Sequence, residues 1–128
     1  MNQKQILLKS LEKRGFSKGI LEAFLRTKRE NFIPLNLKEH AYDDNALPIG
    51  YGQTISQPCT IASMLELLDL KKGDSVLEIG SGSGWNAALM GFLVGRKGSV
   101  LSTEIIDSLV ERSRKRIEKI GKEIKYNH

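Results

Sequence analysis

A run of alternating glycine and serine residues stands between two acidic residues at a spacing that indicates ligand binding. The run is Gly80-Ser81-Gly82-Ser83-Gly84; Glu78 precedes it, and Glu104 follows Gly80 by twenty-four residues. Glycines let a backbone turn sharply and approach a ligand closely, and a helix that opens after such a turn presents unpaired N–H groups. A carboxylate at the end of the next strand accepts hydrogen bonds from ribose hydroxyls. The pattern therefore predicts a cofactor that contains a ribose.

Two classes of cofactor share this layout, and the glycine spacing distinguishes them. Dinucleotide sites use G-x-G-x-x-G, whereas this chain has G-x-G-x-G with an acidic residue two positions earlier. The form E-x-G-x-G-x-G resembles the first motif of the S-adenosylmethionine-dependent methyltransferases. It suits a ligand without a pyrophosphate, whose cationic amino-acid end favours a nearby carboxylate. The alternative is an ordinary glycine-rich turn with Glu78 as a strand-end residue. The resemblance implies S-adenosyl-L-methionine as cofactor, bound by Glu78, Gly80, Ser81, Gly82, Ser83, Gly84 and Glu104.

A second motif, LPIGYGQTISQP over residues 47–58, precedes the glycine run. It resembles the signature of the protein-L-isoaspartate O-methyltransferases, which have a G-x-G-Q-T-I-S-x-P segment just before the helix that precedes the cofactor strand. The segments FIP (residues 32–34), AYDD (41–44) and MLELL (64–68) match the surroundings of that signature in order and spacing. The resemblance therefore covers nearly the whole chain and is to the N-terminal portion of that family.

This family resemblance implies both a reaction and the residues that perform it. The reaction is methyl transfer from S-adenosylmethionine to the free carboxylate of L-isoaspartyl residues in damaged proteins, which is a repair reaction. Ser56 corresponds to the active-site serine of the family, and Gln53, Thr54 and Ile55 would lie, like Ser56, against the cofactor and the isoaspartyl group. A second interpretation makes Ser56 a helix N-cap, because serine is favoured there and Pro58 falls in the first turn. The two interpretations are compatible.

The elements that must position these residues follow from hydrophobic periodicity. Apolar residues three and four positions apart predict helices near residues 6–11, 17–25, 56–68, 85–94 and 106–120. Residues 75–79 and 99–103 are expected to be strands, and residues 122–128 the start of a third. Between Pro34 and Gly52 the apolar residues show no helical or strand periodicity, so this segment is expected to be a long loop. Long loops of this kind are often functional.

A strand, a glycine turn, a helix, a strand and a helix form a βαβα unit, which builds parallel doubly wound sheets. We therefore expect an α/β, Rossmann-like methyltransferase sheet with a helical N-terminal extension. Residues 1–56 would be the extension and the substrate and cofactor loop, and residues 57–128 the first half of the S-adenosylmethionine-binding domain. The resembled fold has seven strands, so this sheet is expected to be incomplete. A truncated binding module of low activity, or half of a split enzyme completed by a C-terminal half, is the alternative function.

Composition limits the partners and the location. The 128 residues are 40% hydrophobic and 27% charged, as in soluble globular proteins. Cys59 is the only cysteine, which favours a reducing, cytoplasmic location, and we interpret it as a small packed residue. No signal peptide or membrane-spanning run is expected. The net charge of +5 lies mainly in helices where basic and acidic residues alternate, which argues against nucleic acid. His40 and His128 are the only histidines, and no metal site is expected.

Overall fold

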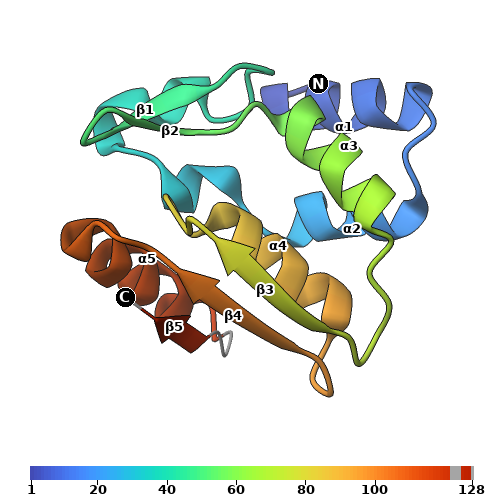
Figure 1. The fold of residues 1–128 in the computed structure, drawn as a ribbon. Coiled ribbons are helices and arrows are strands. Elements are labelled where there is room, and N and C mark those ends of the chain that lie inside the picture. Colours follow the sequence, from blue (N-terminus) through green and yellow to red (C-terminus); the bar gives the residue numbers. More distant parts are fainter. Residues whose placement is uncertain (122–124, 128) are drawn as a thin grey trace. The chain divides into compact units, whose positions relative to one another are not determined.

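The fold comes from a computed structural model that describes residues 1–121 and 125–127. These residues form two compact units, Met1–Asp69 and Leu70–His128, which are described separately (Figure 1). The helix α3 (Pro58–Leu68) belongs to the first unit, where it contacts α2 (Lys18–Arg26). The division expected from the sequence, at residue 56, places α3 with the second part of the chain. That division stays a prediction about domain organisation.

The first unit begins with two helices whose N-termini are capped by side chains. In α1 (Gln3–Lys13), the Asn2 side chain accepts a hydrogen bond from the Gln5 N–H, and the Gln5 side chain accepts one from the Asn2 N–H. The α2 helix opens after Ser17, whose hydroxyl accepts from the Ile20 N–H at 3.4 Å. This confirms the opening predicted near Ser17. Such caps satisfy N–H groups that have no partner within the helix.

The segment expected to be an irregular loop contains regular structure. It has a 3-10 helix over Leu35–His40 and the strand β1 (Leu47–Gly50), which forms an antiparallel hairpin with β2 (Gln53–Ile55) just after the segment. Another 3-10 helix, Arg29–Phe32, precedes the segment. The expectation of a loop without regular elements through Gly52 was therefore wrong, because strands of three and four residues are too short to show a period. The turn residues Tyr51 and Gly52 have φ angles of 57° and 69°, the left-handed conformation that tight hairpins require.

The helix α3 begins two residues later than Ser56. Its N-cap is Gln57, and Pro58 occupies the first helical position, where its missing N–H leaves no intrahelical bond unmade. The interpretation of Ser56 as the N-cap was therefore wrong. The apolar residues buried in the first unit come from α1, α2, α3, the hairpin and the segment 32–41: Leu7, Leu11, Ile20, Ala23, Phe24, Phe32, Ile33, Ala41, Ile49, Ile55, Ile61, Ala62 and Leu65.

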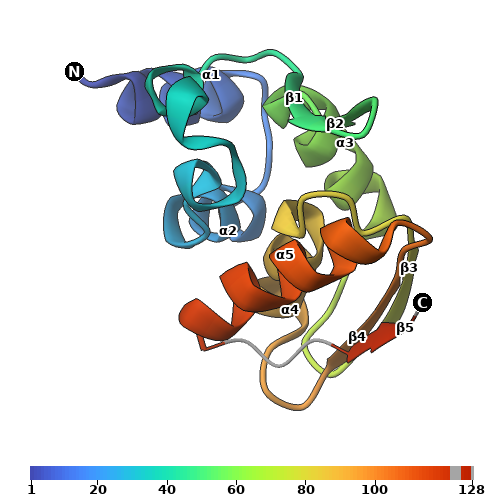
Figure 2. The same ribbon diagram turned by 90° about the vertical axis from the view of Figure 1, so that its left-hand side faces the viewer.

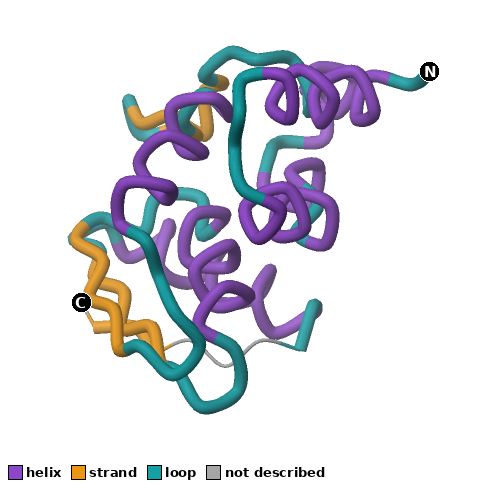
Figure 3. The backbone as a smooth tube through the Cα atoms, turned by 90° about the vertical axis from the view of Figure 1, so that its right-hand side faces the viewer, coloured by secondary structure: helices purple, strands orange, loops and turns teal. Residues whose placement is uncertain are grey.

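The second unit is the predicted βαβα arrangement with a further strand. A parallel sheet has the order β3 (Ser75–Ile79), β4 (Ser99–Thr103), β5 (Lys125–Asn127), and α4 (Trp85–Val94) and α5 (Asp107–Lys119) connect the strands. Figures 2 and 3 show both helices on the same side of this sheet, as expected for two successive right-handed crossovers. The third strand predicted from residue 122 is confirmed over Lys125–Asn127; residues 122–124 and 128 lie outside the described part of the chain.

The two faces of the sheet differ in burial. In β3 and β4, Glu78, Val100 and Ser102 are buried, whereas Leu77 and Ile79 are 61% and 79% exposed and alternate with them. Strands of parallel sheets are apolar on both faces because helices normally cover both. The helices α4 and α5 cover one face of this sheet, and apolar side chains are exposed on the other.

Candidate cofactor and acceptor site

The glycine turn is bound to the end of the neighbouring strand by main-chain hydrogen bonds. The N–H groups of Gly80 and Ser81 both donate to the Thr103 carbonyl at 2.8 Å, and the Gly84 N–H donates to the Ser81 carbonyl at 2.9 Å. The loop after β3 therefore has a fixed path at the carboxyl ends of two parallel strands. In open α/β sheets this edge is where ligands bind.

Glu104 lies directly against the glycine turn. Its Oε1 accepts a hydrogen bond from the Gly82 N–H at 2.9 Å, and its Oε2 accepts from the N–H groups of Ile105 at 2.9 Å and Ile106 at 3.2 Å. The side chain is nearly buried, with 8% of its surface exposed. The structure thus brings together the two motifs that the sequence analysis paired by spacing alone.

Glu78 is the second carboxylate of the site, and it is held by two polar side chains. Its Oε1 accepts from the Ser102 hydroxyl at 2.5 Å, and its Oε2 accepts from Nδ2 of Asn86 at 2.9 Å. Burial raises the pKa of Glu78 above its ordinary value; the hydrogen bonds from Ser102 and Asn86 oppose this shift, and the negative charge of Glu104 adds to it. The structure therefore places two carboxylates of different character beside one turn.

The sequence analysis missed Ser102 and Asn86. Ser102 is paired with Glu78 in the parallel register of β3 and β4, so its position was readable once that register was assumed. A hydroxyl at an inward-facing position of an apolar strand is the signal that would have found it. Asn86 is the second residue of α4, and only the three-dimensional path of the glycine turn places it near Glu78.

Two glycines of the turn have different surroundings. A Cβ on Gly84 would lie 2.8 Å from Cβ of Ser113, so a glycine is needed there for α5 to pack against the turn. A Cβ on Gly80 would meet no atom within 4 Å, so open space lies beside that residue. The hydroxyl of Ser81 is buried and has no hydrogen-bond partner among the described residues. By contrast, the Ser83 hydroxyl accepts from the Trp85 N–H at 3.1 Å.

The candidate acceptor residues lie in the first unit, on and after β2. The side chains of Gln53, Thr54 and Ser56 are exposed, whereas Ile55 is 2% exposed and packs among apolar residues. A contact between the cofactor and these four residues stays a prediction. The main chain of Ser56 is nevertheless firmly placed, because its carbonyl accepts a hydrogen bond from Nη2 of Arg29 at 3.0 Å. Sequence analysis gave no role to Arg29.

The remaining residues considered in the sequence analysis, Cys59 and His40, are accounted for by packing and local hydrogen bonds. Trp85, which directly follows the glycine turn, is 2% exposed. Cys59 is half-buried, and its N–H donates to Oδ1 of Asp44 at 2.8 Å. His40 pairs with Asp43 at 2.9 Å on the surface. No group of three His, Cys, Asp or Glu side chains in residues 1–121 is arranged to hold a metal ion.

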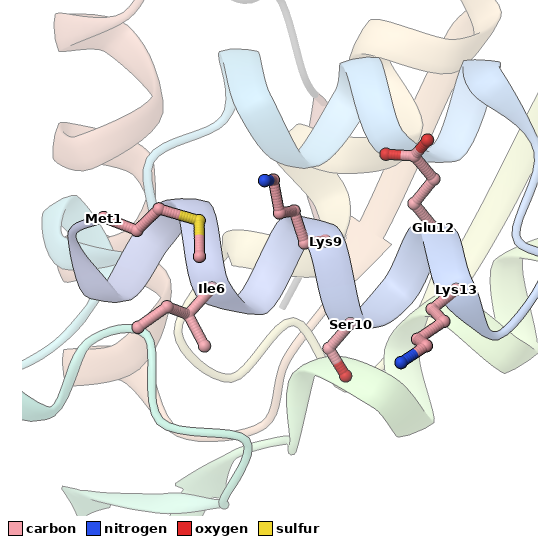
Figure 4. A pocket seen from close by; sticks show the side chains of 6 residues that line it. All are labelled: Met1, Ile6, Lys9, Ser10, Glu12 and Lys13. Atoms are coloured by element: carbon pink, nitrogen blue, oxygen red, sulfur yellow. The ribbon is translucent and has the colours of Figure 1, made fainter.

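A hollow on α1 is separate from these residues. It has a volume of about 640 Å³ and is lined by Met1, Ile6, Lys9, Ser10, Glu12 and Lys13. Figure 4 shows that these side chains come from α1 and from the residues just before it. None of the candidate site residues lines it. No helix in the described part of the chain has the length and apolar character needed to cross a membrane.

The family model for "Protein-L-isoaspartate(D-aspartate) O-methyltransferase (PCMT)" matches residues 2–127. The chain belongs to the protein-L-isoaspartate O-methyltransferase family. Proteins of this name from Fervidobacterium nodosum and Ignicoccus hospitalis are 49% and 45% identical to it over 116 and 121 residues. The matches cover 91% and 93% of this chain but 58% and 57% of those proteins. The chain spans about half the length of the curated relatives it matches, a share that fits the predicted N-terminal portion.

Solved structures of protein-L-isoaspartate O-methyltransferases confirm the fold. One is 37% identical and superposes with a TM-score of 0.87 over 97% of this chain and 41% of its own. A second, from Plasmodium falciparum and described as a complex with S-adenosyl-L-homocysteine, is 28% identical with a TM-score of 0.84 over 100% of this chain and 63% of its own. The family resemblance and the Rossmann-like α/β fold expected from the sequence are both confirmed.

Proposed function

We propose that this chain binds S-adenosyl-L-methionine and takes part in methyl transfer to the free carboxylate of L-isoaspartyl residues in damaged proteins. Membership of the protein-L-isoaspartate O-methyltransferase family supports the reaction. The observation that carries the proposal is the position of two carboxylates, Glu78 and Glu104, beside a glycine turn at the carboxyl ends of β3 and β4. A related structure that is 28% identical is described as a complex with S-adenosyl-L-homocysteine, the product of this cofactor.

The residues of the turn fit that cofactor chemically. An ionised carboxylate can accept about four hydrogen bonds. Glu104 accepts three from N–H groups, so it can still accept one from a ribose hydroxyl. The carboxyl group of Glu78, in its ionised form, would complement the cationic amino-acid end of the cofactor. The open space beside Gly80 admits a ligand close to the main chain, and the Ser81 hydroxyl can supply a further polar contact.

The reaction requires the protein chiefly to align the acceptor carboxylate with the methyl group of the cofactor. Bound S-adenosylmethionine supplies a methyl group on a good leaving group. The acceptor carboxylate, with a pKa near 4, is ionised at neutral pH, so no general base is required of the chain. Proximity and orientation can lower such a barrier by about 7–11 kcal/mol. We assign to the exposed Ser56 hydroxyl the task of holding one carboxylate oxygen while the other attacks. The nitrogen of the following peptide bond then attacks the methyl ester, methanol leaves with the proton of that nitrogen, and a succinimide forms without further help from the chain.

The test compares two peptides that differ only in one residue, L-isoaspartate or L-aspartate. The chain is incubated with S-adenosylmethionine carrying a labelled methyl group, and base-labile label in each peptide is counted. We expect label in the isoaspartyl peptide and at most a trace in the aspartyl peptide. Equal labelling of both, or no labelling by a chain that binds S-adenosylhomocysteine, would contradict the proposed acceptor.

A second candidate function is supported by the exposed apolar face of the sheet. Leu77, Ile79 and Leu101 are 61%, 79% and 38% exposed on β3 and β4, where parallel strands are normally covered. In this alternative the chain is a binding module, or half of a split enzyme that a second polypeptide completes. The experiment adds the C-terminal part of the Fervidobacterium nodosum relative, beyond the matched region, as a separate polypeptide. Activity that appears only in the mixture favours the split enzyme, and activity of the chain alone excludes it.

We also propose that the protein works in the cytoplasm and binds neither nucleic acid nor membranes. A single cysteine that is half-buried favours a reducing compartment. On α5, Glu111 pairs with Arg114 at 3.8 Å and with Lys115 at 3.9 Å, which favours a solvated face of mixed charge over a nucleic-acid site. Cell fractionation and a titration with duplex DNA at physiological salt test these two statements. Recovery outside the cytoplasm, or saturable DNA binding, would contradict them.

A further inference from the structure

Arg29 is a fully buried charged residue whose guanidinium donates hydrogen bonds to four main-chain carbonyls. Its Nη1 donates to the carbonyls of Ala41 at 3.0 Å and Asp43 at 3.2 Å. Its Nη2 donates to those of Asn45 at 2.7 Å and Ser56 at 3.0 Å. One guanidinium thus connects three points of the segment 41–45 with the residue that follows β2. Its side chain has 0% of its surface exposed.

The surroundings keep this guanidinium charged. Burial lowers the pKa of Arg29 from its ordinary value to about 10, and the negative charges of Asp44 and Asp43 oppose this shift. The group therefore remains protonated at neutral pH. Hydrogen bonds from a charged donor are stronger than those between neutral groups. The planar fork of an arginine can serve several acceptors at once, which an ammonium group cannot do with the same geometry.

The contact with Ser56 differs from the other three because of what that residue carries. The Ser56 carbonyl points to Arg29, while the Ser56 side chain is exposed. On one side β2 is paired with β1 through Leu47 and Ile55; on the other, the Cys59 N–H is bound to Asp44, within the segment that Arg29 also contacts. Ser56 is thus fixed on both sides, by the strand pairing of Ile55 before it and by the contact between Cys59 and Asp44 after it.

We propose that Arg29 is the positioning residue for Ser56: its guanidinium sets the orientation of the peptide from which the Ser56 hydroxyl projects toward the acceptor carboxylate. This inference rests on the proposed methyl transfer for its consequence in catalysis. The positional part stands on the four hydrogen bonds alone. A residue that merely stabilises the first unit would affect all of its helices equally, whereas a positioning residue affects the segment around Ser56 first.

The test uses R29K and R29A, with R26K and R26A as matched controls. Arg26 lies three residues earlier at the end of α2, is 67% exposed in its side chain, and pairs with Glu22 at 2.8 Å. Amide hydrogen exchange is measured for residues 53–59 and, for comparison, for residues of α1. We expect exchange at 53–59 to be roughly tenfold or more faster in R29K, with α1 changed far less, because lysine cannot serve four carbonyls. The controls should leave both regions unchanged.

Chemical rescue separates position from general stability. Millimolar guanidinium should restore protection of residues 53–59 in R29A, and equimolar ammonium should not. Should R29A not fold alone, it is folded with guanidinium, which is then diluted; residues 53–59 are predicted to lose protection before α1 does. Unchanged exchange at 53–59 in R29K, or protection lost equally across α1 and residues 53–59, would overturn the proposal.

A kinetic measurement connects this position to catalysis. R29K should lower kcat/KM for an isoaspartyl peptide by roughly tenfold or more, and the control R26K should leave it unchanged. The exchange measurement needs no enzymatic activity. If the wild-type chain transfers no methyl group but the exchange result holds, the proposed function fails and the role of Arg29 stands. If the wild type is active and R29K matches it, the role of Arg29 fails.

Discussion

The Gly82 N–H donates to Oε1 of Glu104 at 2.9 Å, which joins the glycine turn to the residue that follows β4. The other oxygen of the same carboxylate accepts from two successive N–H groups, those of Ile105 and Ile106. Glu104 therefore orders the site before any ligand is present. Glu104, which the sequence analysis expected only to contact a ribose, also holds the glycine turn in place.

This relationship predicts a loss of stability in E104A. Three N–H groups lose a charged acceptor, and hydrogen bonds of this kind contribute about 1.5–3 kcal/mol. The free energy of unfolding in urea should fall by about that amount, and the Gly82 amide should exchange faster with solvent. E111A is the matched control, because Glu111 is 57% exposed on α5. An unchanged exchange rate at Gly82 in E104A would show that the carboxylate does not order the turn.

Glu78 predicts a specific dependence of stability on pH. Burial raises its pKa in the folded protein above the ordinary value of 4.5. Its favourable contribution is therefore complete below pH 4.5 and is lost as pH rises through the folded pKa, because ionising the buried group costs free energy. E78Q has no such loss. Urea unfolding from about pH 4 to about pH 8 should show E78Q gaining stability relative to wild type as pH rises. A difference that stays constant or shrinks with pH would contradict this.

S56A separates the side chain of Ser56 from its main chain. The N-cap of α3 is Gln57, and Arg29 contacts the Ser56 carbonyl, so the substitution removes neither contact. We expect the free energy of unfolding to change by less than about 0.5 kcal/mol. Methylation of an isoaspartyl peptide should fall about 10- to 100-fold, because one group that aligns the acceptor is lost. A large loss of stability would return Ser56 to a structural role.

The two ends of the glycine turn predict different costs for alanine. Gly80 and Gly84 have φ angles of +89° and +91°, so alanine at either costs about 1–2 kcal/mol of left-handed strain. Only at Gly84 does the new Cβ meet another atom, Cβ of Ser113 at 2.8 Å, which adds about 1–3 kcal/mol of overpacking. Urea unfolding, followed by the fluorescence of the buried Trp85, should show G84A to be the less stable variant.

A double-mutant cycle identifies the clash at Gly84. S113G removes the Cβ that G84A meets, so it should recover part of the loss in G84A; S113A keeps that Cβ and should recover none. Equal stability of G80A and G84A, or equal recovery by S113G and S113A, would mean that α5 moves away from the turn at little cost.

The sequence predicted the second unit well because its signals are local. Residues 75–79 and 99–103 each contain adjacent apolar residues, the glycines mark the turn between β3 and α4, and Glu104 follows from the spacing. The family motif singled out Ser56, whose catalytic role stays a prediction. The hairpin could not be predicted from hydrophobic periodicity, because its strands have only four and three residues.

Two kinds of site residue escaped the sequence analysis for physical reasons. Ser102 donates a hydrogen bond to Glu78 from the neighbouring strand, and Asn86 donates one from beyond the glycine turn. Neither residue belongs to a linear motif. Arg29 is one of many basic residues in a chain of net charge +5, and nothing in its neighbours indicates burial. Its acceptors are main-chain carbonyls, which every sequence contains. Only the fold shows that four of them converge on one side chain.

The central claim is that the glycine turn with Glu104 is a cofactor site, and calorimetric titration with S-adenosyl-L-homocysteine tests it most directly. The chain is first shown to be folded by circular dichroism. We predict saturable binding by the wild type that falls at least about tenfold in E104A, which loses a charged acceptor for the ribose, and that is unchanged in E111A. A folded wild-type chain that shows no binding, or that binds as tightly when Glu104 is alanine, would contradict the assignment.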